Sequence, residues 1–140
     1  MIVQPSILCI MDFTESSLEA LKWAAGMAKK FDAHLTILHP YRLNQLQKKE
    51  DMIWVKKKID QDAAKDFDKI ASDLLKNGKI SYEFRSEVGF INDRVQEHAR
   101  KNNTLFLVIG KDFATENKEA LSDLIAQTEV PLVIIPATNH

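Results

Sequence analysis

Side chains that could bind a ligand follow the apolar runs of this sequence, at the points where the runs end. Asp12 follows the first run, Pro40 ends the second, and Gly110 is followed by Lys111 and Asp112 after the fourth. In an open parallel sheet, ligands bind beyond the carboxyl ends of the strands. The Asp12 carboxylate could accept hydrogen bonds from a base or a ribose. An aspartate just ahead of a helix is also stabilised by the helix dipole without any ligand, so both interpretations stay open.

No group of residues indicates catalysis or a metal ion. His39 has no carboxylate or serine at a diagnostic spacing, and Glu87 and Asp112 belong to different loops and form no recognisable acid–base pair. The other histidines are too scattered for metal ligands: His34, His98 and His140. We therefore expect no catalytic residue and no metal.

The composition of the chain indicates which partners and which cellular compartment to expect. The net charge is −1, from 19 basic and 20 acidic residues, which gives no electrostatic reason to bind nucleic acid or an anionic membrane. The single cysteine, Cys9, lies in an apolar run and is expected to pack as a small core residue in a reducing compartment. No targeting segment and no apolar run of about 20 residues is visible, so we expect a cytoplasmic protein.

Five short runs predict strands. Four are almost continuously apolar, as in strands that are buried on both faces, whereas the run at 80–88 alternates between apolar and polar, as in an edge strand. The runs are Ile7–Met11, His34–Pro40, Ile80–Val88, Thr104–Gly110 and Pro131–Pro136.

Helical patterns separate these runs. Apolar residues recur at spacings of three and four within 18–31, 43–77, 92–101 and 116–128. The first helix could begin with a capping box of Ser16 and Glu19, or with Thr14 as the N-cap. Phe31, Trp54 with Ile59, and Ile125 are expected to face inward, and 42–54 is expected to be the most mobile part of the chain. Alternating strands and helices predict one doubly wound α/β domain over residues 1–140.

Two doubly wound classes do not fit. A response-regulator receiver needs two adjacent acidic residues after the first strand, but Phe13 follows Asp12. A flavodoxin needs a glycine in that loop, and residues 12–17 contain none.

Five segments resemble the universal stress protein family, in the family's order. They are Ile7–Ala24, Ala33–Pro40, Glu87–Gly89, Leu107–Gly110 and Val130–Pro136. The resemblance implies the adenine nucleotide alpha hydrolase-like fold, a five-stranded parallel sheet in the order 3-2-1-4-5 with helices on both faces. Strands three and five would then be the sheet edges.

Some members of this family bind ATP through Gly-x-x-Gly, nine residues, and Gly-Ser or Gly-Thr after the fourth strand. Gly110 matches the first glycine, but Phe113 and Asp123 stand where the others should be, and the stretch is shorter. Losing two charge-assisted hydrogen bonds would weaken affinity roughly 100- to 10,000-fold. The expected remnant is a weak adenine nucleotide pocket near Asp12, Phe13, Pro40, Gly110 and Lys111, with no cofactor held tightly.

The sequence thus favours a non-catalytic, dimeric stress-response module that works through protein partners. The alternative is a nucleotide-binding protein with weak or no hydrolysis, in which Lys111 supplies charge to the phosphates. Leu132–Ile135 is apolar on both faces and contains no lysine, so as an edge strand it is expected to pair with a second copy.

Overall fold

The elements of the sheet alternate with helices along the whole chain. The computed structural model describes residues 4–43, 48–76 and 78–137. The strands are β1 (Ser6–Ile10), β2 (His34–Tyr41), β3 (Tyr82–Val88), β4 (Thr104–Gly110) and β5 (Leu132–Ile135). The helices are α1 (Glu15–Phe31), α2 (Lys49–Leu74), α3 (Ile91–Lys101), α4 (Lys111–Glu116) and α5 (Lys118–Gln127).

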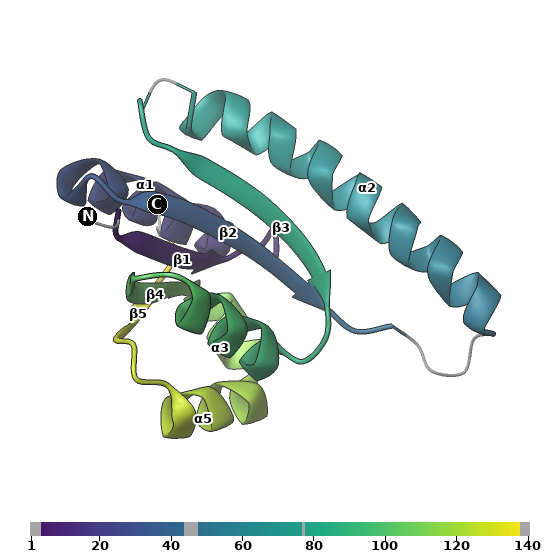
Figure 1. Ribbon diagram of the computed structural model, residues 1–140. Helices are drawn as coiled ribbons and strands as arrows, with labels where there is room; N and C mark the ends of the chain where they lie inside the picture. Colours follow the sequence, from purple (N-terminus) through teal and green to yellow (C-terminus); the bar gives the residue numbers. More distant parts are fainter. Residues whose placement is uncertain (1–3, 44–47, 77, 138–140) are drawn as a thin grey trace.

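The strands form one parallel sheet in the order β3-β2-β1-β4-β5 (Figure 1). This confirms the predicted fold class and strand order. β1 is central and buried along its whole length, whereas β3 alternates between half-buried and exposed residues, as an edge strand should. β5 is the other edge.

Two layers of helices cover the sheet because alternate residues of each strand point to opposite faces. On one face, Ile7 and Cys9 of β1 pack with Leu21 of α1 and Phe67 of α2. On the other face, Leu8 packs in a cluster with residues of α3, α4 and α5. Burial raises the pKa of the Cys9 thiol to about 12, with a further contribution from the Asp12 charge, so Cys9 stays protonated as a core residue.

The start of α1 is set by Thr14. Its hydroxyl oxygen accepts a hydrogen bond from the Ser17 amide at 3.3 Å, which makes Thr14 the N-cap. The alternative capping box does not form, because the Ser16 hydroxyl instead accepts a hydrogen bond from the Asp112 amide.

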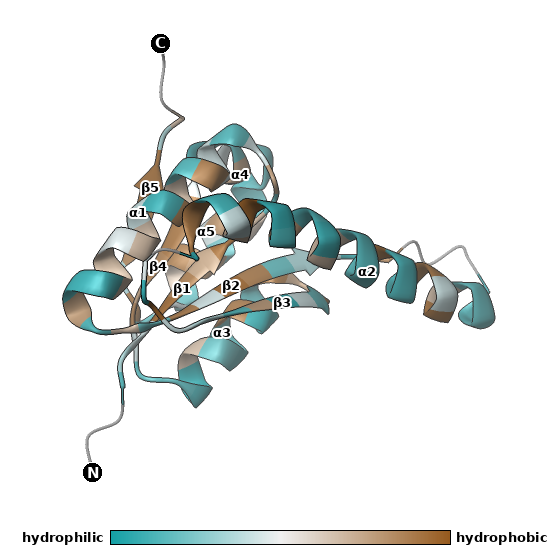
Figure 2. Cartoon of the chain, turned by 90° about the horizontal axis from the view of Figure 1, so that it is seen from above, coloured by the Kyte–Doolittle hydropathy of each residue, from teal (hydrophilic) through white to brown (hydrophobic). Residues whose placement is uncertain are grey.

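Some predicted helix orientations are wrong. Trp54 is 65% exposed, because it lies on the face of α2 opposite Val55 and Ile59, in a part of the helix that extends past the sheet (Figure 2). Ile59 is half-buried, as expected. Phe31 and Ile125, at helix ends, are also mostly exposed. The last helical pattern, 116–128, corresponds to α5, whereas α4 precedes it over residues that were not expected to be helical.

The region 42–54, expected to be mobile, includes residues 44–47, which lie outside the described residues, as does Asn77 at the expected end of α2. Within the described ranges, no helix combines the length and the apolar character needed to cross a membrane.

Candidate functional site

A cavity of about 300 Å³ lies at the carboxyl ends of β1 and β2, next to the turn after β3 and to α4. Its place beside the β1–β4 junction, where the winding of the sheet reverses, is the place where open α/β sheets bind ligands. The volume is at the lower end of the range for small-molecule pockets. The cavity is lined by Asp12, Thr14, Pro40, Tyr41, Arg42, Gly89, Ile91, Phe113, Glu116 and Asn117.

The Asp12 side chain both lines the cavity and holds the turn before α1. Its Oδ1 accepts hydrogen bonds from the Thr14 amide at 3.2 Å and from the Thr14 hydroxyl at 2.6 Å. The Asp12 amide donates to the Ser17 hydroxyl at 3.1 Å. This local turn accounts for the carboxylate without a ligand, and the carboxylate also forms part of the cavity wall.

Phe13 adopts a left-handed backbone conformation with φ of 62°. Its ring contacts the edge of His39, with ring centroids 5.3 Å apart, and His39 stacks on Tyr41. His39 Nδ1 lies 2.8 Å from the Met11 carbonyl oxygen, so this nitrogen carries the proton and donates it. Phe13 does not line the cavity. Phe13 and His39 therefore pack against each other at the ends of β1 and β2.

Gly110 is in contact with the first turn of α1. A Cβ atom there would lie 2.6 Å from Ser16 Oγ and 2.7 Å from the Ser17 amide nitrogen. Ser16 and Asp112 fasten this contact, since the Asp112 amide donates to Ser16 Oγ at 2.8 Å and the Ser16 amide donates to Asp112 Oδ2 at 3.4 Å. The glycine is explained by helix–strand packing, and Gly110 does not line the cavity.

Phe113 occupies the position of the second glycine in the ATP-binding pattern. Its side chain is 5% exposed and packs in the core beneath α4. α4 begins directly after Gly110, so this stretch is a helical turn. A phosphate-binding loop needs open backbone amides. The aromatic ring and the helix together replace the loop with packed structure.

Lys111 does not line the cavity that contains Asp12. It lines a separate hollow of about 290 Å³ with Asp112, Thr115, Glu116, Pro136 and Ala137. Of the five residues predicted for the site, the structure thus brings Asp12 and Pro40 together at one cavity. Phe13, Gly110 and Lys111 lie at nearby strand ends but do not line this cavity.

Arg42, Ile91 and Asn117 line the cavity and were missed in the sequence. The Arg42 guanidinium lies 3.7 Å from the centre of the Phe90 ring, a cation–π contact that holds a positive charge at the rim. The available signal was their position just beyond an element end: Arg42 directly follows β2, Ile91 begins α3 and Asn117 separates α4 from α5.

A hydrogen-bonded cluster around Asp60 ties α2 to the sheet below the cavity. Asp60 Oδ1 accepts from the Tyr41 and Ser86 hydroxyls, both at 2.8 Å, and Oδ2 accepts from Lys56 at 2.8 Å. Burial alone would raise the pKa of Asp60, but these hydrogen bonds outweigh it and lower the pKa. Burial and the bond to Asp60 raise the pKa of Tyr41. This cluster positions Tyr41 at the cavity wall.

The sequence comparison decides the family. The profile described as the universal stress protein family matches residues 5–136. The chain belongs to the universal stress protein family. A comparison with curated protein sequences gave no match.

Solved universal stress proteins share the fold at low sequence identity. A family member from Burkholderia pseudomallei is 16% identical, with a TM-score of 0.74 over 94% of this chain and 96% of that one. A universal stress protein from Archaeoglobus fulgidus in complex with dAMP is 20% identical, with a TM-score of 0.64 over 96% and 99%. A further universal stress protein structure, in complex with cAMP, is 18% identical, with a TM-score of 0.64 over 98% of this chain and 100% of that one.

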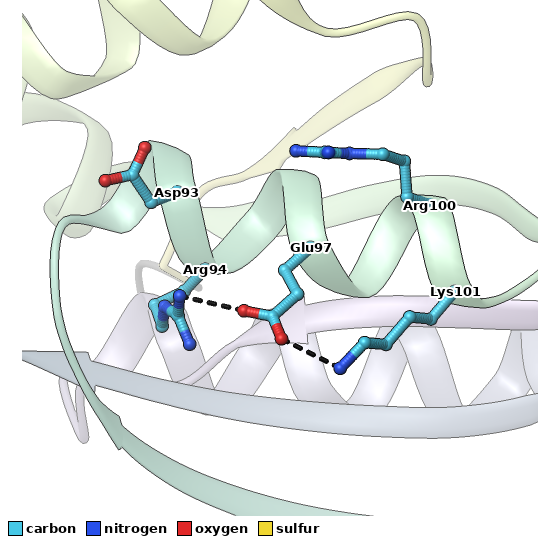
Figure 3. A pocket seen from close by; sticks show the side chains of 5 residues that line it. All are labelled: Asp93, Arg94, Glu97, Arg100 and Lys101. Atoms are coloured by element: carbon cyan, nitrogen blue, oxygen red, sulfur yellow. Dashed lines mark hydrogen bonds and ion pairs between the residues drawn. The ribbon is translucent and has the colours of Figure 1, made fainter.

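A larger hollow on this universal stress protein, of about 530 Å³, lies along α3 (Figure 3). Arg94 and Lys101 both pair with Glu97 at 2.8 Å, and the bond from Lys101, followed by the nearby charges, lowers the pKa of Glu97. Its lining residues all belong to one helix. This is a charged surface on a single helix and receives residues from no strand end, although Arg94 also packs against Gly89 of the first cavity, so the cavity beside Asp12 remains the candidate site.

Within the described ranges, no cluster of three or more histidine, cysteine, aspartate or glutamate side chains could hold a metal ion.

Proposed function

We propose that this universal stress protein is a non-catalytic stress-response module that acts through protein partners and does not bind ATP tightly. The observation that carries the proposal is Phe113, whose ring is packed in the core where ATP-binding members have a glycine. The cavity wall adds two carboxylates, Asp12 and Glu116, which would repel a triphosphate.

The test is a calorimetric titration of the native protein with ATP and Mg²⁺. We expect no dissociation constant in the low micromolar range or tighter, and a constant in that range would refute the proposal. The variant Phe113→Gly should not restore binding, because α4, the short connection and the missing later glycines are unchanged.

The absence of catalysis is part of the same proposal. A hydrolase needs a positioned base or nucleophile. The acidic groups on the cavity wall are Asp12, which already accepts two hydrogen bonds from Thr14, and Glu116, which is exposed. We expect phosphate release from ATP at the rate of the buffer alone. Release that is lost in Asp12→Asn but retained in Asp123→Asn, a change at an exposed residue of α5, would overturn this part of the proposal.

A second candidate function is weak binding of a nucleoside or mononucleotide. The observation that favours it is the cavity itself, which combines the Asp12 carboxylate, apolar walls from Pro40 and Ile91, and one cation, Arg42, at the rim. Related solved structures contain dAMP and cAMP. One phosphate needs a single cation, whereas three phosphates need much more.

Thermal-shift measurements with adenosine and AMP test this second function. We expect a small stabilisation by millimolar AMP that Asp12→Ala abolishes and Arg42→Ala reduces for AMP but not for adenosine. If neither ligand stabilises the native protein, and Asp12→Ala alters only its stability, the cavity has no nucleotide function.

We further propose that the protein is a homodimer through β5 (Leu132–Ile135). This strand is a sheet edge with an apolar side chain, Ile134, 45% exposed, and prolines only mark its ends. An uncovered apolar edge is an aggregation hazard that a second copy would remove.

A further inference from the structure

The first eleven residues of α2, Lys49–Ile59, form an arm that extends past the sheet (Figures 1 and 2). The buried residues of α2, Ala63, Phe67 and Ala71, all follow it. At 1.5 Å per residue the arm is about 16 Å long. The Asp60 cluster therefore attaches α2 to the sheet at the point where the arm begins to extend beyond it.

The two faces of this α2 arm differ. Met52, Val55 and Ile59 are half-buried and share one face. The opposite face carries Glu50, Ile53, Trp54 and Lys57, spaced at i, i+3, i+4 and i+7 and all exposed. We name these four residues the outer stripe. Ile53 is 67% exposed and Trp54 is 65% exposed.

An arm of this kind gains little stability by itself. An isolated helix of this length is marginal in water. The side-chain pairs that support it, Lys56–Asp60 and Lys58–Asp62, have the lysine first, which is the weaker orientation. Lys48 at the N-cap makes no side-chain capping bond. A tryptophan and an isoleucine exposed side by side on this arm indicate a surface that binds a partner.

The charges of the outer stripe indicate what covers it. We propose that the outer stripe binds the outer stripe of a second copy of this chain, antiparallel, around a two-fold axis between Ile53 and Trp54. In this arrangement Glu50 faces the second copy's Lys57 and Ile53 faces its Trp54, and the symmetry makes each contact twice. A parallel arrangement would place like charges together, so the charge pattern selects the antiparallel one.

This contact is separate from the pairing proposed for β5. α2 packs on β3, where Phe67 stacks on Phe84 at 4.5 Å, and β3 and β5 are opposite edges of the sheet. The arm is too short to bury the roughly 1,200 Å² of a stable standard interface. The arm contact is therefore a reversible association that adds to the oligomeric state set elsewhere.

An anionic membrane is the competing partner, because Lys48, Lys49 and Lys56 to Lys58 make the arm basic. A membrane-binding helix needs a long apolar face opposite a basic one. Here Glu50 lies within the outer stripe and Asp51 follows it, so carboxylates would meet the lipid headgroups. The self-complementary pattern favours the second copy.

Charge reversal tests the contact by sedimentation velocity over a range of concentrations at low salt. Glu50→Lys and Lys57→Glu, each alone, should raise the dissociation constant of self-association about tenfold or more, because every former ion pair becomes a like-charge pair. An equimolar mixture of the two variants should associate as the native protein does, since each chain then supplies the charge that the other needs. The double variant should also be restored.

The control is Lys65→Glu, which reverses an exposed charge on the same helix beyond the arm and should change nothing. Circular dichroism checks that each variant keeps its helix content. The proposal is overturned if the single reversals associate like the native protein, or if the mixture fails to recover association.

A crosslink places the contact independently. Glu50→Cys mixed with Lys57→Cys should give an intermolecular disulfide faster than Glu50→Cys mixed with Lys65→Cys, and native Cys9 is buried and does not interfere. Equal rates contradict the antiparallel arrangement. Trp54→Ala should lose association. If Trp54→Ala instead loses binding to phosphatidylserine vesicles while self-association is unchanged, the arm binds membranes and the proposal fails.

Discussion

Gly110 lies against the amino-terminal turn of α1, where a side chain would have no room. Its contacts, Ser16 and Ser17, belong to a helix that is distant in the sequence and is brought close by the β1–β4 pairing. A glycine that fits the first position of a phosphate-binding pattern is thus required by packing alone. The same residue type satisfies both demands, because both arise from the close approach of backbone.

The variant Gly110→Ala measures this packing. Its Cβ would overlap the Ser16 and Ser17 backbone, which cannot move without breaking the Thr14 cap, so we expect a loss of about 1–3 kcal/mol or more in the free energy of unfolding. Urea denaturation checks the value.

Gly26→Ala is the matched control for that substitution. It lies inside α1 with nothing within 4 Å of an added Cβ, and it should stabilise the protein by about 0.5–1 kcal/mol. Equal effects of the two alanines would show that Gly110 is not packed as described.

At the candidate site, the sequence correctly predicted the residues that follow the ends of neighbouring parallel strands, because such strands end at the same edge of the sheet. Asp12 and Pro40 end adjacent parallel strands, so they had to lie close together. Lys111 was also at a strand end, but α4 begins there and directs it to another hollow. Arg42 also follows a strand end, but the sequence does not show the contact with Phe90 in a different loop that holds its charge at the rim.

Among the elements, α2 shows what periodicity can and cannot determine. The apolar spacing through Ala63, Phe67 and Ile70 predicted a helix correctly and gave its buried face. The same spacing continues to Ile59 and Val55, which are only half-buried because the sheet ends earlier, so the pattern could not tell which apolar residues have a core to contact. The Asp60 cluster marks this boundary. Trp54 lies on the opposite face of the helix.

Asp60 should make the attachment of α2 sensitive to acid. Its pKa is lowered in the folded protein, so the unfolded chain binds its proton more readily. The stabilisation from Asp60 is complete above the ordinary aspartate pKa of about 3.9 and is lost as the pH falls through the lowered value. In Asp60→Asn we expect a loss of about 1–3 kcal/mol in the free energy of unfolding at neutral pH.

Urea denaturation at neutral pH and near pH 3 tests this sign, because the difference between native protein and Asp60→Asn should shrink in acid. Asp62→Asn is the control, since its partner Lys58 is exposed and such pairs contribute about 0–1 kcal/mol. A difference that grows in acid would contradict the assignment.

In the whole molecule, the two edge strands of the sheet differ in how they are protected from pairing with other chains. β3 has polar residues on its outer positions and is packed by α2, whereas β5 is short and apolar. The order of the strands could not come from periodicity, since every doubly wound order has the same alternation of strands and helices. It came from the resemblance of five segments to the family, and that resemblance also identified the unprotected edge.

Ile134→Lys tests whether a second copy covers β5. Ile134 is 45% exposed in the single chain, so a lysine is tolerated there by the monomer. In a dimer through this strand its ammonium would be desolvated without a partner, at a cost of several kcal/mol. We expect the native protein to sediment as a dimer or larger at micromolar concentration and Ile134→Lys to shift toward smaller species. Ala126→Lys adds the same charge at an exposed position of α5 and should leave the oligomeric state unchanged.

Because the α2 arm is at the other edge of the sheet, only Ile134→Lys combined with Lys57→Glu should give a monomer at high concentration. A native protein that is already monomeric at that concentration would contradict both contacts.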